Sequence, residues 1–175
     1  LLFAVSIIVT RYLGKESLGI YAALLVIPNF VRLLNMLGVE TLINKKLPEL
    51  NVIDSSGHQG RYLLQSLLTF RLVTSSILCI FLYFILPYYL EFINKQELLE
   101  YRTAILMYFL VITVNSFLST LFMTQLRYKV VSITETVSAV LNLVLLAIFV
   151  VVDSGIFGVL YAYILATAMN ILIYT

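Results

Sequence analysis

The sequence has few of the residues on which common active sites depend. It contains one cysteine, one histidine and no tryptophan. The single cysteine, Cys79, cannot form a disulfide within the chain, and His58 has no second histidine with which to build a metal site or a catalytic triad. The seven glycines lie singly, so no glycine-rich phosphate loop is present. We therefore expect no cofactor, no metal site and no enzymatic activity.

Charge is equally scarce. Charged residues make up 11% of the chain and apolar residues 62%, whereas soluble domains have about 25% charged residues. The net charge is +2, and no basic run with interleaved aromatic residues is present, which argues against nucleic acid as a partner. A chain of this composition, with a mean hydropathy of +1.04, cannot cover its surface with polar groups. The composition predicts an all-α membrane protein in contact with membrane lipids.

The apolar runs predict a short first helix and five spanning helices. A spanning helix needs about 20 mostly apolar residues, and residues 1–10 form a run that is too short, so we expect a first helix that is truncated. The full runs cover residues 18–37, 62–86, 103–125, 133–152 and 156–175. Together these runs predict a single lobe over residues 1–175, a six-helix transmembrane bundle with its first helix truncated.

Prolines and polar stretches predict where these helices bend or end. Pro28 lies inside the first full run and predicts a kink, whereas Pro87 is expected to end the second run. Residues 39–50 alternate apolar and charged side chains with the spacing of an amphipathic segment that lies in the membrane interface. Residues 51–60 are expected to form a loop.

Two arginines fall where lipid should exclude them, since an ionisable side chain at the helix centre costs roughly 2.5–3.5 kcal/mol on insertion scales. Arg32 lies roughly 9 Å from the end of its helix and Arg71 about 15 Å from the start of its own, at 1.5 Å per residue. Either side chain could reach the headgroups, or both could face an aqueous cavity and attract an anion. Tyr21 and Asn35 share a helix face with Arg32, which favours the cavity.

Other polar residues also gather on single helix faces. Glu135 and Asn142 share a face of the run 133–152, so Asn142 is a further cavity candidate and Glu135 is the candidate for coupling transport to a cation. A hydroxyl stripe follows the run before it, at Thr113, Ser116, Thr120 and Thr124. We interpret this stripe as helix packing, and the small-residue ridge Gly158, Ala162 and Ala166 as a close helix contact.

Short motifs carry a resemblance to a transporter family. They are Arg11-Tyr12-Leu13-Gly14, Leu18-Gly19-Ile20-Tyr21, Leu37-Gly38-Val39, Lys46-Leu47-Pro48-Glu49, Gln125-Leu126-Arg127-Tyr128-Lys129 and the turn with Gly155 and Gly158. In this order they resemble the amino-terminal region of polysaccharide biosynthesis proteins, the O-antigen-type oligosaccharide flippases. Those proteins belong to the multidrug/oligosaccharidyl-lipid/polysaccharide exporter superfamily.

The resemblance implies the amino-terminal lobe of a two-lobe exporter, with the missing carboxy-terminal lobe as its partner. Such an exporter flips a lipid-linked oligosaccharide, a polyprenyl-pyrophosphate glycan destined for lipopolysaccharide or similar envelope polymers, across the cytoplasmic (inner) membrane by alternating access. The family's cavity is cationic, and Arg32 and Arg71 are the residues to which we carry that role. Asn35, Tyr21 and Asn142 would complete the cavity.

Three other functions are open at this point. A multidrug or cation exporter of the same superfamily would depend on carboxylates at membrane depth, for which Glu135 is the only candidate. A membrane glycosyltransferase or polymerase of a surface-polysaccharide pathway would need a large polar loop with catalytic residues, and only residues 38–61 are long enough. A structural scaffold would place both arginines in the headgroups.

Overall fold

The described residues are helical apart from Gly38 and the short connections 125–127 and 152–154. The computed structural model describes residues 2–36, 38–53, 58–92 and 96–174. In chain order its elements are α1 (Leu2–Met36), α2 (Val39–Ile53), α3 (His58–Phe92), the 3-10 helix η1 (Gln96–Tyr101), α4 (Arg102–Thr124), α5 (Tyr128–Val151) and α6 (Gly155–Tyr174). No strand occurs within these ranges, and the prediction of an all-α bundle is confirmed.

Five helical stretches are long and apolar enough to cross a membrane. They are Ser17–Asn35, His58–Phe92, Gln96–Thr124, Tyr128–Val151 and Gly155–Tyr174. Most of their residues are not buried within the chain; in the α5 stretch only 17% are. The outward faces carry large apolar side chains such as Phe30 and Phe84, which suit lipid and not water. The protein is therefore a multi-pass α-helical membrane protein.

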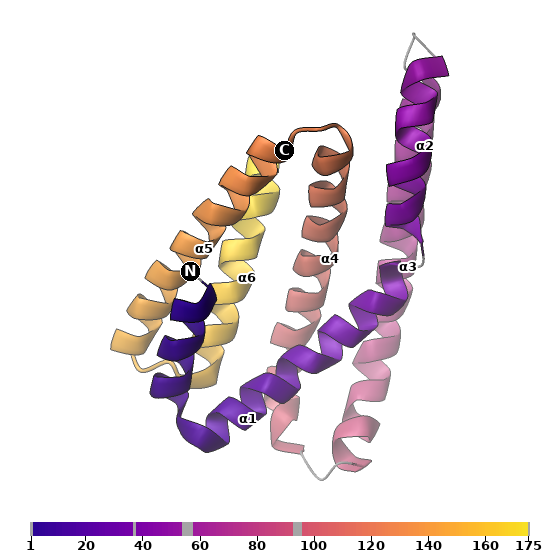
Figure 1. Ribbon diagram of the computed structural model, residues 1–175. Helices are drawn as coiled ribbons and strands as arrows, with labels where there is room; N and C mark the ends of the chain where they lie inside the picture. The colour runs from indigo at the N-terminus through magenta and orange to yellow at the C-terminus, as the bar shows by residue number, and fades with distance from the viewer. Residues whose placement is uncertain (1, 37, 54–57, 93–95, 175) are drawn as a thin grey trace.

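Helix α1 changes direction at Gly14. This glycine has φ 71° and ψ 177°, a backbone conformation that residues with a side chain rarely adopt. Before Gly14 the helix lies beside α5, and after it α1 runs obliquely across the bundle toward α2 (Figure 1). The hydroxyl of Tyr12 fixes this arrangement, because it donates to Asp153 Oδ1 at 3.2 Å and accepts from the Gly155 backbone N–H at 3.0 Å.

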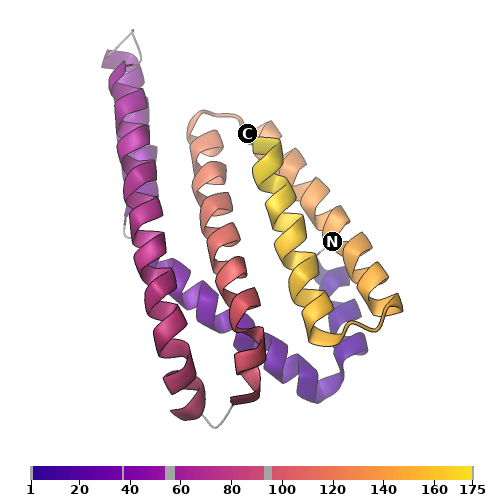
Figure 2. The same cartoon turned by 180° about the vertical axis from the view of Figure 1, so that it is seen from behind.

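Helices α2 and α3 lie side by side and extend beyond the ends of α4, α5 and α6 (Figures 1 and 2). Helix α3 has 35 residues and is about 52 Å long, against a hydrocarbon core of about 30 Å. Val39, Ile43 and Leu47 form the buried face of α2 and pack on α3 and α4. The amphipathic segment predicted over residues 39–50 thus lies in a helix whose apolar face is directed at protein. Its position in the membrane interface stays a prediction.

Several predicted boundaries differ from the structure. Residues 51–53 and 58–60 of the predicted loop are helical, in α2 and α3, and the rest of that loop, 54–57, lies outside the described residues. Helix α3 passes through Pro87 to Phe92, because Leu86 and Leu90 continue its buried face and one lost backbone hydrogen bond is tolerated in a membrane helix. Helix α5 starts at Tyr128 and not at residue 133.

Helix α6 packs most closely of all. Its small-residue ridge is buried at Gly158, Ala162 and Ala166, as predicted. A Cβ atom at Gly158 would lie 2.8 Å from the Cβ of Phe149 in α5, closer than real Cβ contacts. The ridge therefore sets the spacing of α5 and α6, on which the groove described below depends.

Candidate functional site

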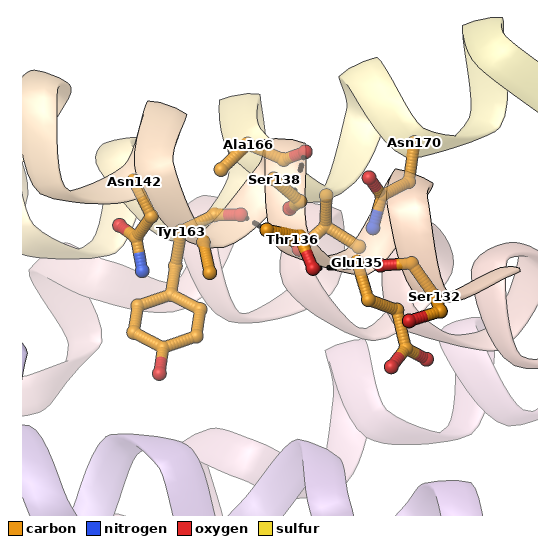
Figure 3. A pocket seen from close by; sticks show the side chains of 10 residues that line it. Ser132, Glu135, Thr136, Ser138, Asn142, Tyr163, Ala166 and Asn170 are labelled. Atoms are coloured by element: carbon orange, nitrogen blue, oxygen red, sulfur yellow. Dashed lines mark hydrogen bonds between the residues drawn. The ribbon is translucent and has the colours of Figure 1, made fainter. Parts of the chain in front are cut away.

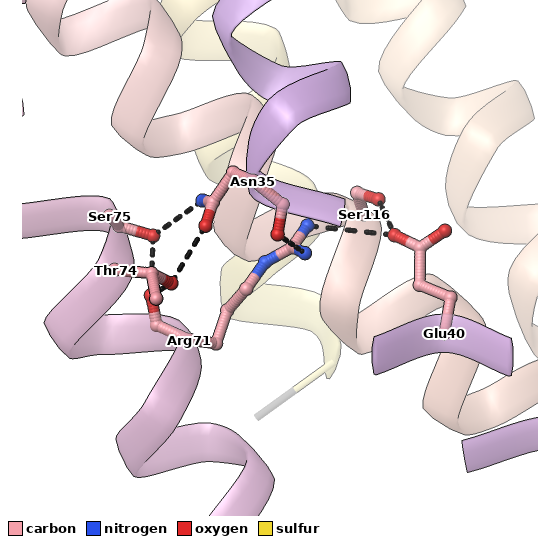
Figure 4. A network of polar contacts seen from close by, with 6 residues as sticks. All are labelled: Asn35, Glu40, Arg71, Thr74, Ser75 and Ser116. Carbon is pink, nitrogen blue, oxygen red and sulfur yellow. Dashed lines mark hydrogen bonds and ion pairs between the residues drawn. The ribbon is translucent and has the colours of Figure 1, made fainter. Parts of the chain in front are cut away.

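A buried polar network, the Arg71 network, joins the bend between α1 and α2 to α3 and α4 (Figure 4). Arg71 is 2% exposed. Its Nη1 donates to the backbone carbonyl of Asn35 at 2.7 Å, and its Nη2 lies 3.5 Å from Glu40 Oε1. The Asn35 carbonyl belongs to the negative end of the α1 dipole, and Glu40 stands in the first turn of α2. The guanidinium is therefore stabilised by a carboxylate and a helix terminus together.

Asn35 and Glu40 in this network make short hydrogen bonds, whereas Arg71 Nε and Nη2 are buried without one. Asn35, fully buried, donates from Nδ2 to Ser75 Oγ at 2.8 Å and accepts at Oδ1 from Thr74 Oγ1 at 2.8 Å. Ser116 of α4 donates to Glu40 Oε1 at 2.7 Å. The network consequently holds four helices at the point where the chain turns from α1 into α2. It also supports our interpretation of the hydroxyl stripe of α4 as helix packing, since Ser116 belongs to that stripe.

Arg32 differs from Arg71 in having no carboxylate partner. The ion pairs among the described residues are Arg71–Glu40 and the exposed Lys46–Glu49. Arg32 is half-buried, and its Nε is buried without a hydrogen-bond partner. It lies within electrostatic range of Arg71 and of the Tyr108 hydroxyl. Among the described residues no carboxylate forms an ion pair with the Arg32 guanidinium.

Three tyrosines, the tyrosine cluster, lie between Arg32 and the α5–α6 pair. Tyr108 of α4 and Tyr163 of α6 meet edge to face with their ring centroids 6.4 Å apart. Tyr21 of α1 is 9% exposed in the same core and lies within electrostatic range of both. Through Tyr108 the cluster reaches the surroundings of Arg32, and through Tyr163 it reaches α6.

Helices α5 and α6 enclose a polar groove of about 380 Å³ (Figure 3). We call it the α5–α6 groove; its lining is Ser132, Glu135, Thr136, Ser138, Ala139, Asn142, Tyr163, Ala166, Thr167 and Asn170. Ser138 Oγ donates to the Ala166 carbonyl at 3.0 Å and ties the two helices together along its floor. Asn142 and Asn170 are each 5% exposed, and the Oδ1 atom of each has no partner. The carboxylate of Glu135 is exposed.

The structure places the predicted site residues in these three settings: the Arg71 network (Asn35, Arg71), the tyrosine cluster with its neighbouring arginine (Tyr21, Arg32) and the α5–α6 groove (Asn142, Glu135). Whether they serve a common cavity stays a prediction. Within the described ranges no group of three His, Cys, Asp or Glu side chains could hold a metal ion.

Sequence reasoning missed several members of these settings. Tyr163 and Asn170 recur at helical spacing in α6 and form a polar stripe opposite Glu135 and Asn142, a signal that was present but unused. Glu40, by contrast, gave no local signal for its pairing with Arg71, because the two residues are far apart in sequence.

Comparison with known proteins gives one match. The family model described as polysaccharide biosynthesis protein matches residues 1–175, the whole chain. Neither the curated proteins nor the solved structures with which the chain was compared contain a match.

Proposed function

The chain belongs to the polysaccharide biosynthesis protein family, and we propose that it forms the amino-terminal lobe of a transporter for lipid-linked oligosaccharide. The cargo is a glycan joined through pyrophosphate to a polyprenyl lipid, and it moves across the cytoplasmic membrane by alternating access between this lobe and a second one. The family match, the five membrane-spanning stretches and the polar residues at membrane depth support this proposal. No covalent chemistry is required of the chain.

The observation that carries the proposal is the unpaired charge of Arg32. A guanidinium at membrane depth is retained where it faces a substrate or an aqueous path. Arg32 has a buried Nε without a partner and no carboxylate beside it in the described part of the chain. A pyrophosphate supplies the oxygen atoms that a guanidinium binds through paired hydrogen bonds. Arg32 is therefore the residue to which we assign the pyrophosphate.

Arg71 has a different part in the proposal. Its guanidinium already faces Glu40 and the Asn35 carbonyl, so in this conformation its charge is largely neutralised. It would strengthen the positive potential at Arg32 mainly when the ion pair with Glu40 opens. Glu135, exposed in the α5–α6 groove, remains the candidate for binding a coupling proton or cation.

The test is glycan export by the full-length protein in cells that lack the native gene. Arg32→Ala should lower export about tenfold or more, because one charge-assisted hydrogen bond to the cargo is lost, and Arg32→Lys should restore it only in part. Arg61→Ala, which removes an exposed arginine at the start of α3, is the matched control and should export like the parent. Normal export by Arg32→Ala at equal membrane abundance would overturn the proposal.

A further inference from the structure

The α5–α6 groove is polar at a depth where polar groups are costly. Glu135 lies about 10 Å and Asn142 about 21 Å from the start of α5, at 1.5 Å per residue. Lipid cannot satisfy the hydrogen bonds of such side chains, and polar residues at this depth mark substrate or ion paths. Two of the lining side chains, Asn142 and Asn170, are buried and yet have an unpartnered amide oxygen. Asn142 and Asn170 thus have hydrogen-bonding capacity that no group in the described part of the chain uses.

The lining of the groove contains both hydrogen-bond donors and hydrogen-bond acceptors. Figure 3 shows the amide nitrogens of Asn142 and Asn170 pointing to the same side of the helix pair as the carboxylate of Glu135. Amides donate and accept, a carboxylate accepts, and the lining also contains hydroxyls, among them those of Ser132 and Thr136. Since the oxygen and nitrogen of an amide can exchange places, either orientation of the asparagines provides both functions. This mixture matches a ligand whose groups are hydroxyls, because hydroxyls also donate and accept.

The tyrosine ring adds a surface for the apolar side of such a ligand. Tyr163 lies beside Asn142 in the groove, with its ring directed to the same side (Figure 3). A pyranose ring has hydroxyls at its rim and C–H groups on its faces, and an aromatic ring packs against those C–H groups while its hydroxyl stays available for hydrogen bonding.

Size and charge distinguish a sugar from a metal ion. The groove volume of about 380 Å³ falls in the range of pockets for small organic ligands, roughly 300–1,000 Å³. Glu135 is its only carboxylate, and the described residues contain no group of three metal-ligating side chains. We infer that the α5–α6 groove binds an uncharged sugar ring, with Asn142, Asn170 and Glu135 on its hydroxyls and Tyr163 against its face.

This inference rests on the proposed function and extends it, because the groove lies next to the site assigned to the pyrophosphate. Tyr163 contacts Tyr108 edge to face, and Tyr108 lies within electrostatic range of Arg32. Tyr108 and Tyr163 therefore connect the surroundings of Arg32 with the groove. In the cargo the pyrophosphate lies between the lipid and the sugar. With the pyrophosphate at Arg32, the sugar attached to it would lie toward α6.

The test uses the full-length protein in lipid nanodiscs and saturation-transfer NMR with glucose, galactose and N-acetylglucosamine as probes. At least one probe should receive saturation from the parent protein. Asn142→Leu and Asn170→Leu should each weaken that binding about tenfold, since a hydroxyl-binding site loses a directed hydrogen bond. Asn115→Leu is the matched control: Asn115 also has a buried, unpartnered Oδ1 but lies in α4 outside the groove, and its sugar signal should equal that of the parent.

A second variant controls for the possibility that the asparagine variants lose sugar binding by failing to fold. Glu135→Gln changes an exposed side chain and keeps its size, so it should fold like the parent and still weaken the sugar signal. The inference is overturned if no probe is saturated by the parent, or if the groove variants bind sugar as the parent does. It is also overturned if these variants change sodium binding while the sugar signal is unaffected, since the groove would then hold a cation.

Export assays separate this inference from the proposed function. If Arg32→Ala loses export while the groove variants export and bind sugar normally, the sugar site is wrong and the transporter proposal stands. If Arg32→Ala exports like the parent, the proposed function fails, whatever the sugar probes show at the groove.

Discussion

The Arg71 network and the α5–α6 groove are both polar regions of the membrane-spanning helices, but they differ in how far the hydrogen bonds of their asparagines are satisfied. In the network, Asn35 makes three short hydrogen bonds, and Arg71 has a carboxylate and a carbonyl beside it while its Nε and Nη2 are buried without a hydrogen bond. In the groove, Asn142 and Asn170 have unpartnered amide oxygens and Glu135 is exposed. The contacts of Asn35 join helices within the chain, whereas the free hydrogen-bonding capacity of Asn142 and Asn170 supports the ligand that we propose for the groove.

The largest expected effect follows from removing the centre of the network. Arg71→Ala leaves Glu40 and the Asn35 carbonyl in a partly buried site without their cation, and breaking such a pair costs about 3–5 kcal/mol. We expect a marked loss of folded protein and a lower midpoint of thermal unfolding in detergent. Arg71→Ala together with Glu40→Ala should recover part of the loss, because no unpaired charge then remains. Parent-like stability of Arg71→Ala would remove the distinction drawn between the two regions.

A smaller effect is expected from separating α5 and α6. Gly158→Ala would bring a Cβ to 2.8 Å from Phe149 Cβ, and overpacking of this kind costs about 1–3 kcal/mol. The groove should change shape while the Arg71 network, formed by other helices, stays intact. Gly19→Ala is the matched control, since nothing lies within 4 Å of a Cβ at Gly19. Thermal unfolding and the sugar probes of the nanodisc experiment measure the two consequences, and equal stability of the two variants would contradict the close packing of α6.

How much of this comparison the sequence could predict depends on whether the partners are local. The spacing of Glu135 and Asn142 placed both on one face of a helix, and the structure brings them into one groove. The depth of Arg32 and Arg71 was estimated from the length of the apolar runs and stays a prediction. The two arginines differ because Arg71 pairs with Glu40, which approaches it only because α1 bends into α2. A residue pattern within one helix cannot predict a contact between two helices.

Helix ends were less predictable for a related reason. Pro87 was expected to end α3, and the helix continues because Leu86 and Leu90 are buried against neighbouring elements. Intrinsic helix breaking by proline is overridden when packing on both sides of it favours the helix. The change of direction at Gly14, by contrast, follows from the residue itself, since a glycine readily adopts the positive φ that is found there. A kink at Pro28 stays a prediction.

The smallest expected effect comes from making the same substitution, asparagine to leucine, in both regions. The two variants can therefore be compared directly. Asn35→Leu removes the hydrogen bonds to Ser75 and Thr74 and should lower stability by about 1–3 kcal/mol. Asn170→Leu removes an amide that is 5% exposed, against 0% for Asn35, and whose Oδ1 has no partner, so its stability should stay within about 0.5 kcal/mol of the parent. Its sugar binding should nevertheless fall, and Asn35→Leu should keep sugar binding in the fraction that folds. For both variants, thermal unfolding measures stability and saturation-transfer NMR measures sugar binding. If the two substitutions cost the same stability, the asparagines of the groove serve helix packing as Asn35 does, and the groove has no need of a ligand.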